Sequence, residues 1–232
     1  MRTTAAANCA SGAAGSRSPT AEPREPRGDA PSAVSPRITL SNQSAHMQKL
    51  TFIAPVDPHE APDEIRSVLE ESPDLSLLGV MAHAQGSFGP WVSFSTALVS
   101  KLELSPLLRE LAILQVALLD PGGDYEWSQH APLALAAGAS DAQLEALRDA
   151  ELGPHFSDEQ ALVLRFTREI VSVGRAAEET RGALLELLGP RQVVELVEVI
   201  GQYMMVARIV NVAGLEPESL AGIVAQKAEV TR

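Results

Sequence analysis

The stretch that decides the fold runs from Glu110 to His130 and reads ELAILQVALLDPGGDYEWSQH. Its first part continues a helical pattern with an apolar stripe made of Leu107, Leu111, Leu114 and Leu118. The segment Asp120–Asp124 then interrupts the pattern with proline, two glycines and two aspartates. Two helices joined by a tight hairpin are therefore predicted.

Ionisable side chains on the second helix of this hairpin indicate a catalytic site. If Tyr125–Ala137 is helical, Glu126 and His130 stand one turn apart on the same face. Glu110 lies on the shoulder of the apolar stripe of the preceding helix, and the hairpin could bring it near His130. The sequence thus predicts two carboxylates and an imidazole in one semi-buried place. The pKa of Glu110 should be raised there unless a cation pairs with it.

Composition and charge exclude several classes of protein. Hydrophobic residues make up 45% of the chain and aromatic residues 4%, so the core must consist mainly of Leu, Val and Ala, which favours packed helices. The net charge of −12 makes nucleic acid an improbable partner. The single cysteine, Cys9, excludes an internal disulfide and any Cys-x-x-Cys site. No uncharged apolar run is long enough to span a membrane, and we expect a cytoplasmic protein.

Residues 1–46 differ in composition from the remainder. They are rich in Ala, Ser, Pro and Arg and show no periodicity, which predicts a disordered tail. Met47 precedes an ordinary domain start, so the tail could equally be a mis-called extension of the coding sequence. Residues 47–232 are predicted to form one domain.

The domain is predicted to be all-α, with about eight helices and no strand or internal repeat. Capping boxes at Ser140 and Ser157 mark two helix starts, and Gly189-Pro190 is a strong stop. Pro132 predicts either a kink beside His130 or a separate first turn. The expected helices are 63–71, 75–84, 88–101, 106–119, 125–137, 141–148, 158–173, 178–188 and 191–212.

The hairpin resembles the carboxymuconolactone decarboxylase family, which includes the alkylhydroperoxidase D-like proteins. The likeness covers roughly Leu75 to Glu216. It rests on Arg109-Glu110-Leu111, Tyr125-Glu-Trp-x-x-His130, Ala137-Gly-x-Ser140, and Glu195-Leu196 with Gly201-Gln-Tyr203. The resemblance implies a helical homo-oligomer, often a trimer or hexamer.

The resemblance also separates two kinds of chemistry. In the peroxidase branch the segment reads Cys-x-x-Cys-x-x-x-His, but here the cysteine places are Gly123 and Glu126. Neither residue can attack a peroxide or form a disulfide, so peroxiredoxin-like activity is only a family-level alternative. The decarboxylase branch implies acid–base catalysis in aromatic compound catabolism, with no metal and no cofactor. Glu110, Glu126 and His130 could in principle hold a metal, but we predict none.

His130 and Glu110 are therefore the predicted catalytic residues, with Glu126 orienting His130. Glu126 could instead only favour the positive N-terminus of its helix, and the Glu110–His130 pair could be purely structural. A substrate carboxylate would need a cation, and Arg109 points away from the stripe of its own helix, so it would have to act across a subunit boundary. The predicted substrate-binding residues are Trp127, Tyr125, His83, Tyr203 and Arg208.

The predicted function is decarboxylation of a small carboxylated lactone or an acid–base reaction of a related carbonyl compound. Loss of carbon dioxide leaves a dienolate, which needs a group to stabilise the oxyanion and an acid to protonate carbon. The alternatives are hydroperoxide reduction and a non-catalytic helical oligomer that binds a small ligand.

Overall fold

The computed structural model describes residues 51–149 and 153–218. The predicted tail of residues 1–46, with Cys9, lies outside the described residues. The described chain contains helices and no strand, so the all-α prediction is confirmed. The elements are η1 (Pro58–Glu60), α1 (Asp63–Glu71), α2 (Ser76–Met81), α3 (Gln85–Ser100), α4 (Pro106–Leu119), α5 (Asp124–Ala136), α6 (Asp141–Arg148), α7 (Asp158–Val173) and α8 (Glu178–Ala213).

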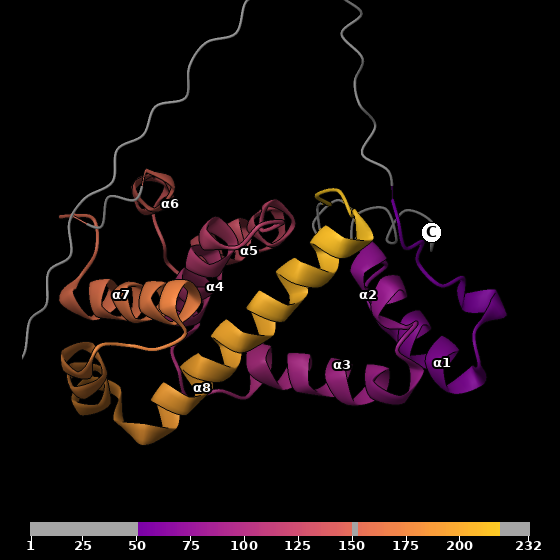
Figure 1. Ribbon diagram of the computed structural model, residues 1–232, viewed down its shortest axis with the longest axis horizontal. Coiled ribbons are helices and arrows are strands. Elements are labelled where there is room, and N and C mark those ends of the chain that lie inside the picture. The colour runs from indigo at the N-terminus through magenta and orange to yellow at the C-terminus, as the bar shows by residue number, and fades with distance from the viewer. Residues whose placement is uncertain (1–50, 150–152, 219–232) are drawn as a thin grey trace, which may run out of the picture. The chain divides into compact units, whose positions relative to one another are not determined.

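Helix α4 lies at the centre of the packing and contacts α5, α7 and α8 (Figure 1). Ser105 caps its N-terminus by accepting a hydrogen bond from the amide of Leu108, and Pro106 occupies its first turn. Its surface is not the single apolar stripe that the sequence predicted. The helix is buried on all sides from Glu110 to Ala117, while Leu118 is 38% exposed. Neighbouring helices cover every face of this segment, so Glu110 is fully buried instead of lying at the edge of an apolar stripe.

The loop between α4 and α5 depends on two glycines. Gly122 has a φ of 95°, which side chains disfavour. A Cβ on Gly123 would lie 1.8 Å from the carbonyl oxygen of Ala117. Gly123 is the N-cap of α5, whose first residue is Asp124. This close approach holds the first turn of α5 against the end of α4.

Helix α5 continues through Pro132. Of the two predicted alternatives, the separate first turn is therefore not formed. The capping boxes at Ser140 and Ser157 are confirmed, with each serine side chain accepting from the third helical amide. Two other boundaries differ from prediction. Helix α2 ends at Met81 instead of residue 84, and α3 begins at Gln85 instead of residue 88 because the amide of Phe88 already bonds the carbonyl of Ala84.

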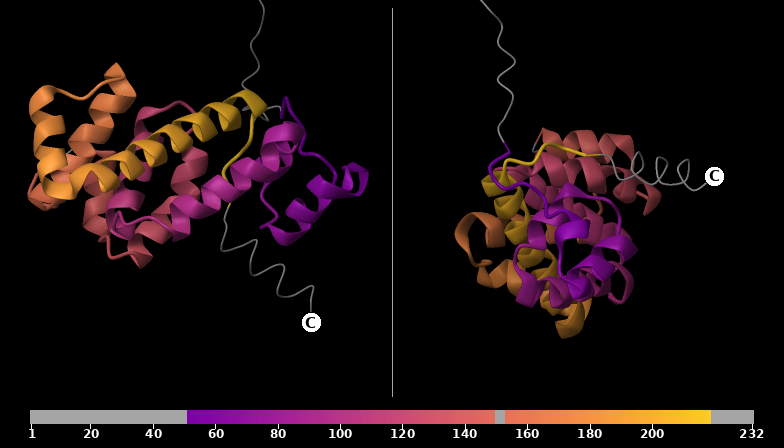
Figure 2. Two further views of the ribbon diagram at one scale, coloured as in Figure 1. Left: turned by 90° about the horizontal axis from the view of Figure 1, so that it is seen from below. Right: turned by 90° about the vertical axis from the view of Figure 1, so that its right-hand side faces the viewer.

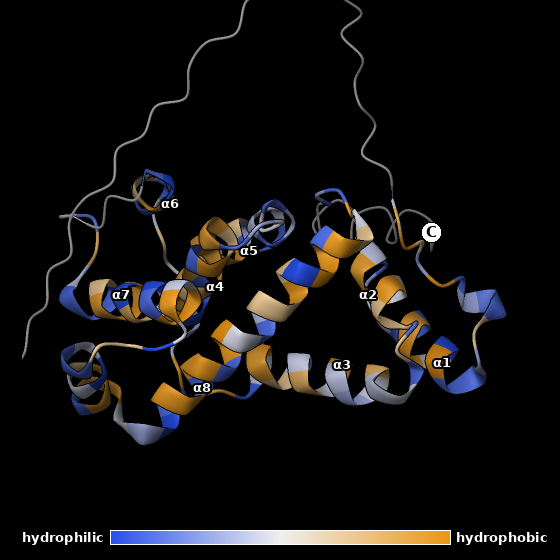
Figure 3. Ribbon diagram, in the orientation of Figure 1, coloured by the Kyte–Doolittle hydropathy of each residue, from blue (hydrophilic) through white to orange (hydrophobic). Residues whose placement is uncertain are grey.

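Helix α8 combines the two last predicted helices. Gly189, with φ 72° and ψ 169°, breaks the helix, and Pro190 opens the next part. The second part lies against α3, α4 and α5 (Figure 2). Figure 3 shows the mixture of apolar and polar residues along α8 that allows it to pack on one side and meet solvent on another. None of the helices in the described ranges has both the length and the apolar character needed to cross a bilayer.

Candidate active site

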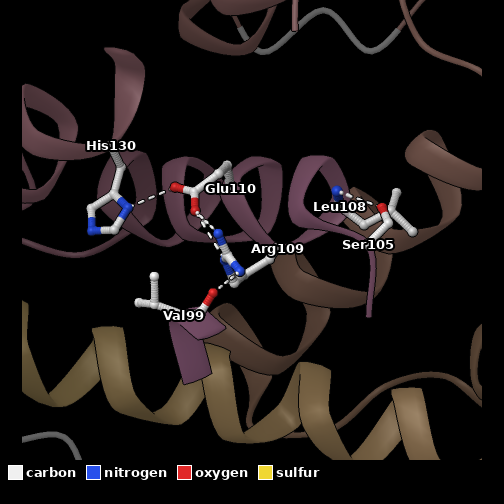
Figure 4. A network of polar contacts seen from close by, with 6 residues as sticks. All are labelled: Val99, Ser105, Leu108, Arg109, Glu110 and His130. Carbon is white, nitrogen blue, oxygen red and sulfur yellow. Dashed lines mark hydrogen bonds and ion pairs between the residues drawn. The ribbon is translucent and has the colours of Figure 1, made fainter. Parts of the chain in front are cut away.

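The imidazole of His130 is bonded directly to the carboxylate of Glu110. The distance from His130 Nδ1 to Glu110 Oε2 is 2.7 Å, across the hairpin from α5 to α4 (Figure 4). Both residues are buried, with Glu110 at 1% exposure and His130 at 9%. Because an ionised carboxylate only accepts hydrogen bonds, Nδ1 carries the proton in the neutral ring and Nε2 offers a lone pair. Within the described chain, Nε2 has no hydrogen-bond partner.

The second oxygen of Glu110 is held by its neighbour in the sequence. Nε and Nη2 of Arg109 donate to Glu110 Oε1 at 2.9 and 2.8 Å, and Nη1 donates to the carbonyl of Val99 at 2.7 Å. Although burial pushes the pKa of Glu110 upward, His130 and Arg109 outweigh it and bring that pKa below its ordinary value. Within the one chain described, the guanidinium of Arg109 is thus engaged by Glu110 of α4 and by the backbone of α3.

Glu126 lies one turn before His130 on α5 and is in a contrasting environment. It is 2% exposed, and neither carboxyl oxygen has a hydrogen-bond partner among the described residues. Burial, with the negative charge of Asp120 as a smaller cause, raises the pKa of Glu126 from 4.5 to about 7. The group is therefore partly protonated at neutral pH and available as an acid. A carboxyl left without a partner in the interior is costly, which favours a functional reason for it.

A cavity of about 260 Å³ lies beside these residues. His130 and Glu126 form part of its wall, and most of the rest is apolar. The other lining residues are Leu75, Leu77, Leu78, Trp91, Ser95, Val99, Tyr125, Gln129, Leu133, Gln202, Tyr203 and Val206. An apolar hollow with a few converging polar groups is the usual form of a small-molecule site.

Two of the predicted binding residues lie at this cavity. Tyr203 of α8 packs edge-on against His130, with ring centroids 4.7 Å apart. Burial and then the negative charge of Glu110 raise the pKa of Tyr203, so its hydroxyl stays protonated. Tyr125 donates its hydroxyl proton to Glu218 Oε2 at 2.7 Å.

The other three predicted binding residues do not line the cavity. The Nε2 atom of His83 lies 2.8 Å from the carbonyl of Ala54 on an exposed part of the surface. Trp127 packs in a different apolar cluster, and Arg148 stacks over its ring at 4.3 Å. Arg208 donates to Asp120 Oδ2 at 2.8 Å and is exposed. Each side chain thus has a local structural partner.

The sequence did not reveal several residues at the site. Gln202 donates to Ser95 across α8 and α3 at 2.9 Å. The buried indole nitrogen of Trp91 has no partner within the described chain. Glu218 accepts from Tyr125 and from the backbone amide of Ser76, joining the end of the described chain to α5 and α2. These contacts join distant segments, and a scan for local motifs gives no signal for them.

The positions of Glu110, Glu126 and His130 also decide whether these side chains could hold a metal ion. In residues 51–149 and 153–218, no group of three His, Cys, Asp or Glu side chains is arranged to hold a metal ion. Glu110, the third potential ligand considered from the sequence, has both oxygens in hydrogen bonds to Arg109 and His130.

Comparison with known proteins supports the resemblance. Residues 87–169, which span α3 to α7, match the family described as the carboxymuconolactone decarboxylase family. That segment contains Glu110, Glu126 and His130, so the resemblance predicted from the hairpin is confirmed there. No curated protein matches the chain.

Solved structures share the fold. An uncharacterized peroxidase-related protein from Silicibacter sp. TM1040 has a TM-score of 0.61 and 18% identity over 74% of this chain and 95% of its own. The debrominase Bmp8, a Cys-to-Ala variant bound to 2,3,4-tribromopyrrole, has a TM-score of 0.58 and 12% identity over 77% and 97%. The "alkylhydroperoxidase AhpD core" of a peroxidase-related protein from Ralstonia eutropha JMP134 has a TM-score of 0.52 and 15% identity over 72% and 93%. The fold is therefore alkylhydroperoxidase D-like.

Proposed function

We propose that the chain is an acid–base enzyme that acts on a small carbonyl compound bound in the cavity beside His130. The observation that carries this proposal is the buried hydrogen bond between His130 and Glu110 at the wall of an apolar cavity that Glu126 also lines. Glu110 has a lowered pKa and holds the imidazole, whereas Glu126, with its pKa raised to about 7, is partly protonated near neutral pH. Separated pKa values of neighbouring groups are the usual basis for assigning a base and an acid.

His130 is the proposed base. Glu110 holds the ring in the tautomer that leaves Nε2 unprotonated, and Arg109 keeps Glu110 ionised. When Nε2 takes a proton from the carbon next to the substrate carbonyl, the imidazolium that forms is stabilised by the Glu110 carboxylate. The electron pair of the broken C–H bond moves onto the carbonyl oxygen and gives an enolate.

Glu126 is the proposed acid. Its carboxyl group can donate a proton to the enolate oxygen, which changes the enolate into an enol and leaves Glu126 ionised. Neither oxygen has a hydrogen-bond partner among the described residues, so in that part of the chain no other group competes with a substrate for the proton. When His130 returns its proton to a different carbon and the enol oxygen returns its proton to Glu126, the carbonyl is restored, both groups regain their starting states, and an isomerisation is complete.

Decarboxylation of a carboxylated lactone, the reaction that the family resemblance implies, uses the same groups. There the C–C bond to the carboxylate breaks, carbon dioxide leaves, and the bond electrons form the dienolate. Protonation at carbon then restores the lactone. Both reactions require an enolate beside a proton donor, so both are members of the proposed class.

The experiment is a turnover assay with a panel of lactones and β-keto acids. His130→Ala should lower kcat by at least about a hundredfold, because general base catalysis contributes on the order of 10² to 10⁴. Glu110→Gln should lower kcat with little change in KM, since Glu110 acts through His130. The matched control is His83→Ala, which removes an imidazole outside the cavity wall.

Three outcomes separate this proposal from its alternatives. Turnover of peroxide that depends on a thiol would support hydroperoxide reduction instead. Ligand binding without turnover, unchanged in His130→Ala, would support a non-catalytic ligand-binding protein. Full activity of His130→Ala on any panel compound would end the acid–base assignment.

A further inference from the structure

We propose that the substrate is an uncharged carbonyl compound with an apolar arm, and that the arm lies in a groove between α3 and the segment 72–78. This inference rests on the proposed function and narrows it to one substrate class. It is carried by the charges around the cavity and by the shape of the space that continues from it.

Among the described residues, the wall of the cavity offers no lysine or arginine to a substrate carboxylate. The one acidic side chain among these lining residues is Glu126. An anion there would lose its hydration without gaining an arginine or lysine partner, and would meet negative charge whenever Glu126 ionises. A neutral carbonyl avoids both costs and accepts the Glu126 proton.

Arg109 and Arg208, the two arginines that the sequence offered as cations for a substrate, are already engaged. All three nitrogens of the Arg109 guanidinium donate to Glu110 or to the Val99 carbonyl, and Figure 4 shows the group on the side of Glu110 away from His130. Arg208 is paired with Asp120, a buried carboxylate. Moving either arginine to a substrate would leave a buried carboxylate without its guanidinium partner, which is unfavourable.

A second space of about 360 Å³ adjoins the cavity. The two spaces share a wall made of Leu75, Leu78, Trp91, Ser95 and Val99. The second continues along the outer face of α3 past Val92 and Thr96 to Ser100, opposite Ser72 and Pro73. Because the shared wall is mostly apolar, an aliphatic or aryl arm attached to the reacting head fits this groove.

A polar atom on the shared wall supplies a hydrogen-bond donor for the ligand. The indole nitrogen of Trp91 is buried and has no hydrogen-bond partner within the described residues. An N–H in this state gains a bond when a neutral acceptor, such as an ester or ketone oxygen, comes within reach. Trp91 is common to both spaces, so this donor lies where the head of the substrate meets its arm.

The test measures binding of γ-lactones whose alkyl arms increase from one to eight carbons, by titration calorimetry with the full chain. Each buried methylene should tighten binding about fourfold until the groove is filled. A ring-carboxylated lactone with the same arm should bind at least about tenfold more weakly than its neutral counterpart. Equal or tighter binding of the carboxylated compound, no dependence on arm length, or no binding of any lactone would overturn the proposal.

A pair of variants on α3 locates the arm. Thr96→Trp places a large ring in the groove from an exposed position and should abolish the gain from long arms while leaving short lactones unaffected. Ser93→Trp introduces the same ring at an exposed position of α3 that does not line the groove, and should change neither. Equal effects of the two variants would contradict the placement.

Repeating the titrations with His130→Ala separates this inference from the proposed function. If no compound is turned over but the neutral long-arm lactones bind as expected, the ligand class holds and the catalytic proposal fails. If a carboxylated lactone is turned over in a His130-dependent reaction and binds best, the catalytic proposal holds and the ligand class fails.

Discussion

The Glu126 carboxyl couples the stability of the fold to pH. Its pKa is 4.5 in an ordinary environment and about 7 in the folded chain, so the folded state binds more protons than the unfolded state between these values. Stability from this group is therefore fully present below pH 4.5 and is lost as pH rises through 7. The loss approaches an upper bound of about 3 kcal/mol, at about 1.4 kcal/mol for each pKa unit.

Glu126→Gln should remove this dependence. Urea unfolding at pH 5 and pH 8 should give a smaller decrease for the variant than for the wild type, and the variant should be the more stable protein at pH 8. A control substitution should lie outside the capping boxes, which rules out Gln143 of α6. Glu145→Gln, on the outer side of α6, is suitable and should leave the pH dependence unchanged. Identical pH profiles for wild type and Glu126→Gln would contradict the buried, protonated carboxyl.

The sequence allowed Glu110 and His130 to be paired but not the charge state of Glu110. The four-residue spacing on α5 and the short loop were enough to place the imidazole near the carboxylate. The pKa of Glu110 was expected to be raised only if no cation paired with it, and Arg109 supplies that cation. Helical periodicity directs a Cα–Cβ bond, but a long arginine side chain can bend back to its neighbour, which periodicity does not predict.

At the scale of elements, the α4–α5 loop is the support of the site. Gly123→Ala should destabilise the protein by more than about 2 kcal/mol, because a buried clash with backbone leaves no rotamer to relieve it. The matched control is Gly182→Ala in α8, where an added Cβ meets nothing within 4 Å. This control should stabilise the protein by about 0.5–1 kcal/mol. Thermal unfolding of both variants measures the difference, and similar melting temperatures would show that the loop tolerates a side chain.

Helix boundaries were predictable where side chains mark them. The serine–glutamine boxes at Ser140 and Ser157 form the reciprocal bonds that their spacing indicates. The start of α3 was missed because Gln85–Ser87 has no apolar periodicity and begins the helix only through backbone bonds to Ala84. Gly189-Pro190 was interpreted correctly as a break, but the next helix begins at once, so the two parts form one long element.

At the scale of the whole molecule, the site is assembled from segments far apart in sequence. The cavity takes walls from residues 75–78, α3, α5 and α8, so no local pattern could reveal its outline. Glu218 illustrates the same limit, since its carboxylate accepts hydrogen bonds from Ser76 and Tyr125.

Glu218→Ala should lower the free energy of unfolding in urea by about 2 kcal/mol, because hydrogen bonds to charged groups are worth about 1.5–3 kcal/mol. Glu216→Ala, at an exposed position, should cost less than about 0.5 kcal/mol.

The predicted homo-oligomer also concerns the whole molecule. We expect its interface to include an exposed apolar face of α8. In the part of α8 after Pro190, the large exposed apolar side chains are Val194 at 58%, Val197 at 43%, Met205 at 39% and Val212 at 63%. They recur on one side of a helix with about 3.6 residues per turn, as expected for a face that packs against another chain. Val197→Glu should therefore lower the sedimentation coefficient by dissociating the oligomer, while Val173→Glu, an equally drastic change at a 67% exposed position of α7, should not. A monomeric wild type would contradict the oligomer prediction. An oligomer that Val197→Glu leaves intact would place the contact on another face.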